Sequence, residues 1–248
     1  MKRLKIIDAY RGFVLVNMLA YHGFYDWVNI LAKPLTWFSA TWVYVWQQMI
    51  VFSFVLISGF VFNYSQHQRR RGILLCLWGC FLTVCTYFFV PQELIIFGVL
   101  SFFGSAMLIT SMLKSSSRHG GIISGFCVLG FLFTQGWQQG YWGFYGVHLA
   151  MLKFAPPDNL FFFILGIPGT SHYSADYAPI FPWIFVFWLG FFGWQIVRHR
   201  LESRSILVKA ESKGAFGVYN SLAFLGRNTL VIYLLHQPIL YFLFKSFF

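Results

Sequence analysis

Charged residues are scarce in this chain: Asp, Glu, Lys and Arg together make up only 10% of its 248 residues. A soluble domain carries about a quarter charged residues. Hydrophobic residues account for 58% of the chain, and its mean hydropathy is +0.65. A water-soluble fold has no means of burying that much apolar surface. The sequence therefore predicts a protein whose solvent is the lipid bilayer.

Acidic residues are the rarest of the charged ones, with 7 against 18 basic residues and a net charge of +11. The basic residues concentrate in the loops on one side of the predicted helices. If the N-terminus is cytoplasmic, only Lys33, Lys153 and Lys245 fall on the far side. This positive-inside bias predicts a membrane protein with its N-terminus in the cytoplasm and its C-terminus outside. It also explains the charge without nucleic acid as a partner.

Long runs of alternating polar and apolar residues are lacking, which argues against a barrel of strands. The apolar runs are instead continuous, and the length allows roughly seven or eight spanning helices of about 20 residues. We therefore expect an all-α bundle forming a single domain over residues 1–248. No internal repeat is evident, which weighs against a transporter built from inverted halves. The expected spans are 6–28, 42–64, 72–90, 94–113, 120–135, 178–197 and 226–246.

The sequence also lacks a metal or disulfide framework. The four cysteines, Cys76, Cys80, Cys85 and Cys127, lie in apolar runs at intervals typical of packing, so no metal site is expected. The first apolar run has no small-residue cleavage site and contains Asp8 and Arg11, so it is interpreted as a helix rather than a signal peptide.

Two segments interrupt the pattern of spans. Residues 136–177 are rich in Gly, Pro and aromatic residues, and the apolar piece 159–168 is too short to cross a bilayer. We expect an outer cap of interfacial or re-entrant segments there, with an additional tight hairpin of spans left open. Residues 198–214 are polar and basic, which predicts a cytoplasmic linker.

The first predicted helix carries four ionisable residues: Asp8, Arg11, His22 and Asp26. At 3.6 residues per turn, these intervals place all four on one face, with Arg11 and His22 roughly 16 Å apart along the axis. His22 is the candidate general base, since a neutral imidazole accepts a proton near neutral pH. Asp26 has the spacing to fix the ring of His22. Arg11 is the candidate to hold Asp8 or an anionic group of a cofactor. A structural polar seam between helices remains the alternative.

Further candidates lie elsewhere in the chain. Asp176 precedes a predicted helix, where a carboxylate caps a helix start or faces an outer active site. In the last span, Arg227 opens the helix, and His236 and Gln237 lie mid-membrane. His236 serves either function or a hydrogen bond between helices. Basic residues at the cytoplasmic face anchor the topology or bind a phosphate-rich ligand or anionic lipid. These residues are Arg69, Arg70, Arg71, Arg198 and Arg200.

Five segments carry a resemblance to a known family: IDAYRGFVLVNMLAYHGFYD, SFVLISGFVFN, IIFGVLSFFGSAMLI, DYAPIFPWIFVFWLGFFG and LGRNTLVIYLLHQPIL. In this order they resemble small bacterial members of the heparan-alpha-glucosaminide N-acetyltransferase catalytic-domain family, which implies a location in the bacterial cytoplasmic (inner) membrane. The interval from Arg11 to His22 is similar to the signature of the family-three membrane acyltransferases. The resemblance implies transfer of an acetyl group from cytoplasmic acetyl-CoA to an outer sugar hydroxyl or amine, with His22 as catalytic base and Arg11 as its companion.

Three functions are compatible with the sequence. The first is this acyltransferase, with acyl-CoA, a carbohydrate or glycolipid acceptor and membrane lipid as partners. The second is a proton-coupled transporter or flippase for a small polar or lipid-linked substrate, in which the buried charges relay protons. The third is a non-catalytic membrane subunit. The acceptor and any homo-oligomer are left open.

Overall fold

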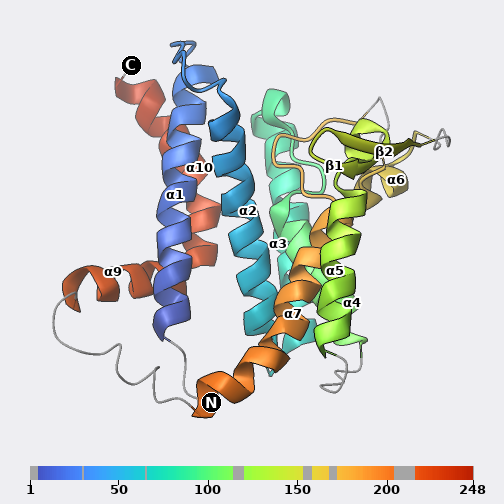
Figure 1. Cartoon of the computed structure of the whole chain (residues 1–248). Helices are drawn as coiled ribbons and strands as arrows, with labels where there is room; N and C mark the ends of the chain where they lie inside the picture. Colours follow the sequence, from blue (N-terminus) through green and yellow to red (C-terminus); the bar gives the residue numbers. More distant parts are fainter. Residues whose placement is uncertain are drawn as a thin grey trace. The chain divides into compact units, whose positions relative to one another are not determined.

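A computed structural model describes residues 5–29, 31–64, 66–113, 120–152, 158–167, 172–203 and 216–247 (Figure 1). Helices dominate these residues, as predicted, and one small sheet accompanies them. The helices in these ranges are α1 (Lys5–Asn29), α2 (Thr41–Phe62), α3 (Gln68–Phe89), α4 (Val99–Ser111), α5 (Gly120–Thr134), α6 (Leu160–Leu165), α7 (Ile180–Ser203), α9 (Phe216–Arg227) and α10 (Thr229–Phe247).

The predicted number of seven or eight spanning helices is wrong by the criterion of length and hydropathy. Within the described residues, three helical stretches are long and apolar enough to cross a membrane: Thr41–Phe62, Gln68–Phe89 and Gly120–Gln139. Three more apolar stretches are shorter, at 10–17 residues: Val99–Ser111, Ile180–Trp194 and Thr229–Phe244. The helix α1 is 25 residues long, but it is too polar to meet this criterion. It carries the charged stripe, which is formed by Asp8, Arg11, His22 and Asp26.

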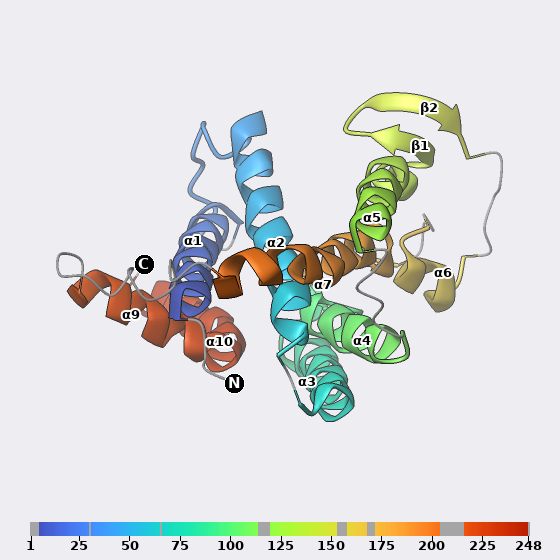
Figure 2. The ribbon, with the colours of Figure 1, turned by 60° about the horizontal axis from the view of Figure 1, so that its bottom comes forward.

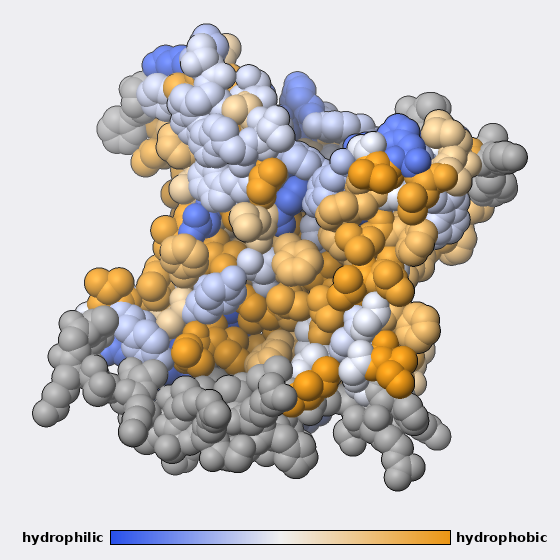
Figure 3. All heavy atoms as spheres, viewed as in Figure 1, coloured by the Kyte–Doolittle hydropathy of each residue, from blue (hydrophilic) through white to orange (hydrophobic). Residues whose placement is uncertain are grey.

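On the face of the molecule that Figure 3 shows, hydrophobic side chains gather at the middle level of the helices. On α3, Leu77 is 61% exposed, Phe88 is 72% exposed and Phe89 is 82% exposed. Water around such a helix would have to solvate a row of large apolar side chains, which opposes folding in an aqueous medium. These surfaces match a lipid environment, in agreement with the composition.

The described residues fall into two compact units, Met1–Ile57 with Arg200–Phe248, and Ser58–His199. In the first unit, α9 lies across the N-terminal half of α1, and α10 runs along the same helix. The span predicted over residues 226–246 corresponds to α10, and α9 is a separate helix that precedes it. The chain turns at Asn228, where the Thr229 hydroxyl donates to the Gly226 carbonyl at 2.7 Å.

Glycines allow α9 to approach α1 closely. A Cβ atom on Gly12 would overlap the backbone carbonyl of Leu222, and one on Gly226 would overlap the carbonyl of Asp8. Small residues at helix crossings are the usual means of packing helices in membranes, because backbones then meet directly. Beside this crossing, α1 and α2 share a buried cluster of Val14, Leu15, Met18 and Ile50.

In the second unit, α3 and α4 form a tightly packed pair, side by side in Figures 1 and 2. Gly79 faces Ser101, and Gly104 faces the backbone and side chain of Cys76. The helix α4 begins at Val99, five residues later than predicted. The preceding residues are not α-helical: Pro91–Glu93 form a short 3₁₀ turn, Phe97 has a φ of 52°, and Gly98 forms a β-bridge with Tyr177.

The segment predicted as an outer cap contains a β-hairpin, which the all-α prediction missed. Strand β1 (Tyr141–Phe144) pairs antiparallel with β2 (Val147–Met151). The two linking residues, Tyr145 and Gly146, have φ values of 37° and 87°. Positive φ at both central residues is the geometry of a two-residue hairpin turn.

The remainder of the cap is held by polar contacts. Asn159 caps α6 by accepting from the Phe162 amide at 3.1 Å. The Tyr177 hydroxyl donates to the Phe163 carbonyl, and the two aromatic rings stack. Burial raises the pKa of Tyr177 above its usual value, so this phenol remains a donor at physiological pH.

Candidate active site

Two histidines from opposite ends of the sequence meet in the first unit. The ring centroids of His22 on α1 and His236 on α10 are 4.8 Å apart, with an interplanar angle of 65°. His22 is half-buried, whereas His236 is only 8% exposed. The sequence marked both as membrane histidines but gave no sign that they touch. Because the chain breaks at Asn228, α10 is free to run along α1 and bring His236 to the charged stripe.

One turn beyond His22, Asp26 is completely buried, with an exposure of 0%. The Gln237 amide nitrogen donates to its Oδ1 atom at 2.9 Å. Gln237 is thus the residue whose role sequence reasoning missed, although its place beside His236 was a signal. The prediction that Asp26 orients His22 stays a prediction.

His236 has a defined tautomer. Its Nδ1 atom lies 2.6 Å from the backbone carbonyl oxygen of Tyr233. A carbonyl oxygen only accepts hydrogen bonds, so Nδ1 carries the proton. In the neutral ring, Nε2 then holds a lone pair and is the atom able to accept a proton or a hydrogen bond.

The ring of Tyr21 also contacts His22 and links it to Trp46. The Tyr21 ring packs edge-on against His22 at 5.8 Å and against Trp46 at 5.6 Å. Trp46 is fixed in turn, because its indole N–H donates to Asn17 Oδ1 at 3.2 Å. Low dielectric around a base strengthens its interactions with a bound substrate.

The remaining candidates of this unit lie apart from the histidine pair. Arg11 sits on α1 three turns before His22. Asp8 lies at the crossing with α9, where its backbone carbonyl faces Gly226. The Arg227 side chain turns back onto its own helix, with Nε donating to the Ala223 carbonyl at 3.2 Å. Arg227 therefore ends α9 rather than opening the helix that carries His236.

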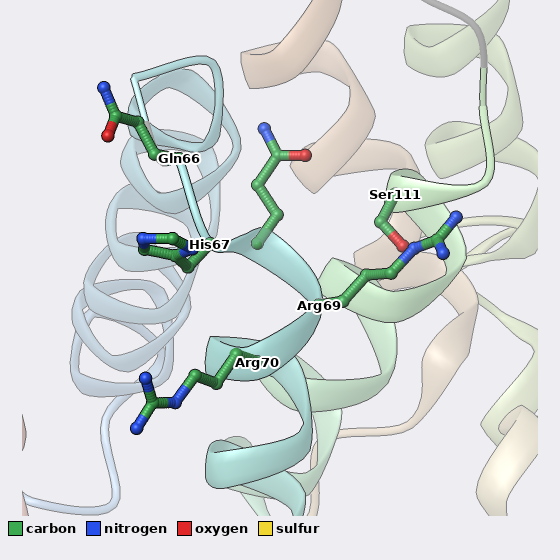
Figure 4. A pocket seen from close by; sticks show the side chains of 6 residues that line it. Gln66, His67, Arg69, Arg70 and Ser111 are labelled. Carbon is green, nitrogen blue, oxygen red and sulfur yellow. The ribbon is translucent and has the colours of Figure 1, made fainter.

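In the second unit, a shallow hollow of about 420 Å³ opens at the start of α3 (Figure 4). Its lining residues are Gln66, His67, Gln68, Arg69, Arg70 and Ser111. Arg69 extends towards Ser111, and Arg70 points away from it. The first backbone amides of a helix and its dipole favour an anion, and arginine adds charge and a bidentate fork. The charge and the helix start at this hollow are therefore compatible with a phosphate-rich ligand.

The other predicted phosphate ligands divide into two groups. Arg71 is exposed and is not part of the lining of this hollow. Arg198 and Arg200 belong to the last turns of α7, and their side chains lie outside the part that the structure describes. Residues 204–214 of the predicted linker also lie outside the described residues, and α7 itself continues through Ser203.

Comparison with known proteins identifies the family. Residues 3–238 match the family described as heparan-alpha-glucosaminide N-acetyltransferase, catalytic. The chain belongs to this family. No curated protein and no solved structure matches it.

Membership of the heparan-alpha-glucosaminide N-acetyltransferase family makes the chain an enzyme of an acyltransferase family, in agreement with the resemblance in its sequence. Together with the apolar helices, it also makes the chain an integral membrane protein. The match covers both units, and therefore both the histidine pair and the basic hollow.

In this family member, Asp176 caps a helix, but not the one that the sequence suggested. Its Oδ2 atom accepts from the Val99 amide at the start of α4, at 3.3 Å. Nearby, the Ser174 hydroxyl accepts from the Ile96 amide at 3.0 Å. The two residues fix the non-helical segment before α4, which indicates a structural role for this carboxylate.

Two substitutions at Asp176 separate capping from catalysis. Asp176→Asn retains a good capping side chain without the charge, so we expect activity and thermal stability close to wild type. Asp176→Ala removes the cap and should lower the free energy of unfolding by about 1 kcal/mol. Thermal unfolding and acyl transfer are measured on the same preparations. Loss of transfer in a stable Asp176→Asn protein would contradict the capping role.

Proposed function

We propose that the chain transfers an acetyl group from cytoplasmic acetyl-CoA to a sugar or glycoconjugate acceptor at the outer side of the membrane, with His22 as general base. The observation that carries this proposal is the packing of His22 against His236, one turn from the buried Asp26. Ionisable residues inside membrane helices are costly and are commonly functional. The family match supports the reaction class.

The chemistry requires few groups. A hydroxyl or amino group of the acceptor attacks the thioester carbonyl carbon while His22 takes its proton. The new C–O or C–N bond forms as the C–S bond breaks, and CoA leaves as a thiolate that recovers a proton. Base assistance of this kind contributes typically 10²- to 10⁴-fold to a rate. Asp26 would stabilise the imidazolium through its position one turn away.

The basic hollow at the start of α3 is the proposed site for the phosphates of CoA. Arg69 and Arg70 line it together with His67, whereas the Arg71 side chain belongs to the same run without lining the hollow. The three arginines can therefore be compared with one another. They are equal in charge and adjacent in sequence, but only Arg69 and Arg70 line the proposed phosphate site.

Neutralising the lining arginines should weaken donor binding selectively. We expect the double variant Arg69→Gln, Arg70→Gln to raise the KM for acetyl-CoA by about tenfold or more, since charge-assisted bonds to phosphate are strong. Arg71→Gln, the matched control, should change it less than twofold. Initial rates at several salt concentrations provide the measurement. If Arg71→Gln raised the KM for acetyl-CoA as much as the double variant does, general surface charge would explain the effect. That result would argue against this site.

The reaction product distinguishes the transferase from a transporter. Purified protein is reconstituted in lipid vesicles with labelled acetyl-CoA on one side and amino sugars on the other. Transfer yields an acceptor that is heavier by one acetyl group, together with free CoA. A protein that moves an unmodified sugar and leaves acetyl-CoA intact would instead be a transporter, and the proposal would fall.

A further inference from the structure

Two buried acceptor atoms on α10 lack a hydrogen-bond donor among the described residues: His236 Nε2 and Gln237 Oε1. Neither atom lies at an exposed surface, where water would be its partner. His236 is only 8% exposed, and both atoms are shielded from solvent. Buried polar atoms nearly always have a partner, so neighbouring exceptions call for an explanation.

Chemistry fixes both atoms as acceptors. Nδ1 of His236 donates to the Tyr233 carbonyl, which leaves the lone pair of the neutral ring on Nε2. The nitrogen of the Gln237 amide donates to Asp26, so its other atom is the carbonyl oxygen Oε1. The site therefore offers two acceptors and requires donors to fill it.

The two acceptors lie against the same face of α1. The His236 ring packs on His22, and the Gln237 amide bonds Asp26, one turn further along. The atoms are thus next to the proposed base and are held in place by contacts that leave Nε2 and Oε1 unused.

We propose that His236 Nε2 and Gln237 Oε1 form a subsite for a second hydroxyl or amino group of the acceptor, adjacent to the group that reacts at His22. The inference rests on the proposed function and deepens it. The acceptor class is then a molecule with two neighbouring hydrogen-bond donors, such as a vicinal diol or an amino alcohol. One donor gives up its proton to His22, and the other binds without reacting.

The second donor explains how a membrane site would select its acceptor. A site whose buried polar groups bond a substrate hydroxyl discriminates strongly against an analogue that lacks it, because its own acceptors are then left unpaired. A simple amine or alcohol fills only the place at His22. At low concentration it would therefore react more slowly than an acceptor with two donors. The difference should appear as a higher KM rather than as a lower kcat.

A pair of matched amines tests the subsite. The probes are 2-aminocyclohexanol, which has two adjacent donors, and cyclohexylamine, which lacks the hydroxyl. With the full-length protein in detergent and acetyl-CoA as donor, we expect kcat/KM to be at least about tenfold higher for the amino alcohol. His236→Asn keeps a donor near the Tyr233 carbonyl but removes the Nε2 acceptor, and it should abolish this preference mainly through KM.

Two further variants secure the interpretation. His236→Gln retains a polar atom near the position of Nε2 and should restore part of the preference; it also serves if the asparagine variant fails to fold. Ile239→Ala, at an exposed position of α10, should keep the full preference.

Each remaining outcome has a defined meaning. Equal use of the two amines by wild type, or a preference that survives in both His236 variants, would overturn the subsite and suggest that buried water fills it. Turnover of acetyl-CoA without acetylation of either amine would also overturn it, but would leave the proposed function standing. Absence of any CoA release would instead refute the proposed function, and with it the subsite.

Discussion

Replacing His22 with alanine is expected to lower acyl transfer by 10²- to 10⁴-fold while the protein still folds. The imidazole is the proposed proton acceptor, and general base catalysis accounts for a loss of that size. His22 is half-buried and packs mainly through ring contacts with Tyr21 and His236. Its removal should therefore affect chemistry more than stability. The effect should appear in kcat, since the base acts in the transition state.

Rates of CoA release and thermal unfolding, measured on the same detergent preparation, check this expectation. His148→Ala provides the matched control, because His148 lies on the exposed strand β2 and has no role in the account. We expect His148→Ala to retain activity. A folded His22→Ala protein with wild-type turnover would remove His22 from the mechanism.

Replacing Gly12 with alanine is expected to have the largest effect on stability. The new Cβ atom would overlap the backbone carbonyl of Leu222, and backbone cannot move aside as a flexible side chain can. The crossing of α1 and α9 would have to open, which costs about 1–3 kcal/mol or more for an overpacked contact. Because α10 follows α9 directly, the His22–His236 contact should loosen as well, and activity should fall together with stability.

Gly23→Ala supplies the control on the same helix. A Cβ atom at Gly23 would meet nothing within 4 Å, so this change should be neutral or should stabilise α1 by up to about 1 kcal/mol through helix propensity. Thermal unfolding in detergent measures both variants. Equal midpoints for Gly12→Ala and Gly23→Ala would show that the α1–α9 crossing is not as close as the structure indicates.

The sequence predicts most of the helices, because continuous apolar runs and helical spacing are local properties. The stripe from Asp8 to Asp26 lies on one helix, α1, as its spacing required. Continuous runs say less about where a helix begins. The predicted fourth span includes residues before Val99, yet Asp176 and Ser174, almost eighty residues later, hold that segment in a non-helical conformation.

The site itself depends on contacts that spacing cannot supply. His22 and His236 are separated by more than two hundred residues, and their meeting requires the break at Asn228 and the glycine crossing of α1 with α9. The pairing of Gln237 with Asp26 is of the same kind. Likewise, the run Arg69–Arg71 looks uniform in sequence, and only the winding of α3 places Arg71 outside the hollow.

The most direct test of the account is whether purified wild-type protein, shown to be folded by a cooperative thermal transition, binds and turns over radiolabelled acetyl-CoA. We predict saturable binding and release of free CoA, with release accelerated by a hydroxyl- or amine-bearing acceptor and lost in His22→Ala. Folded protein that neither binds acetyl-CoA nor releases CoA in the presence of such acceptors would contradict the account.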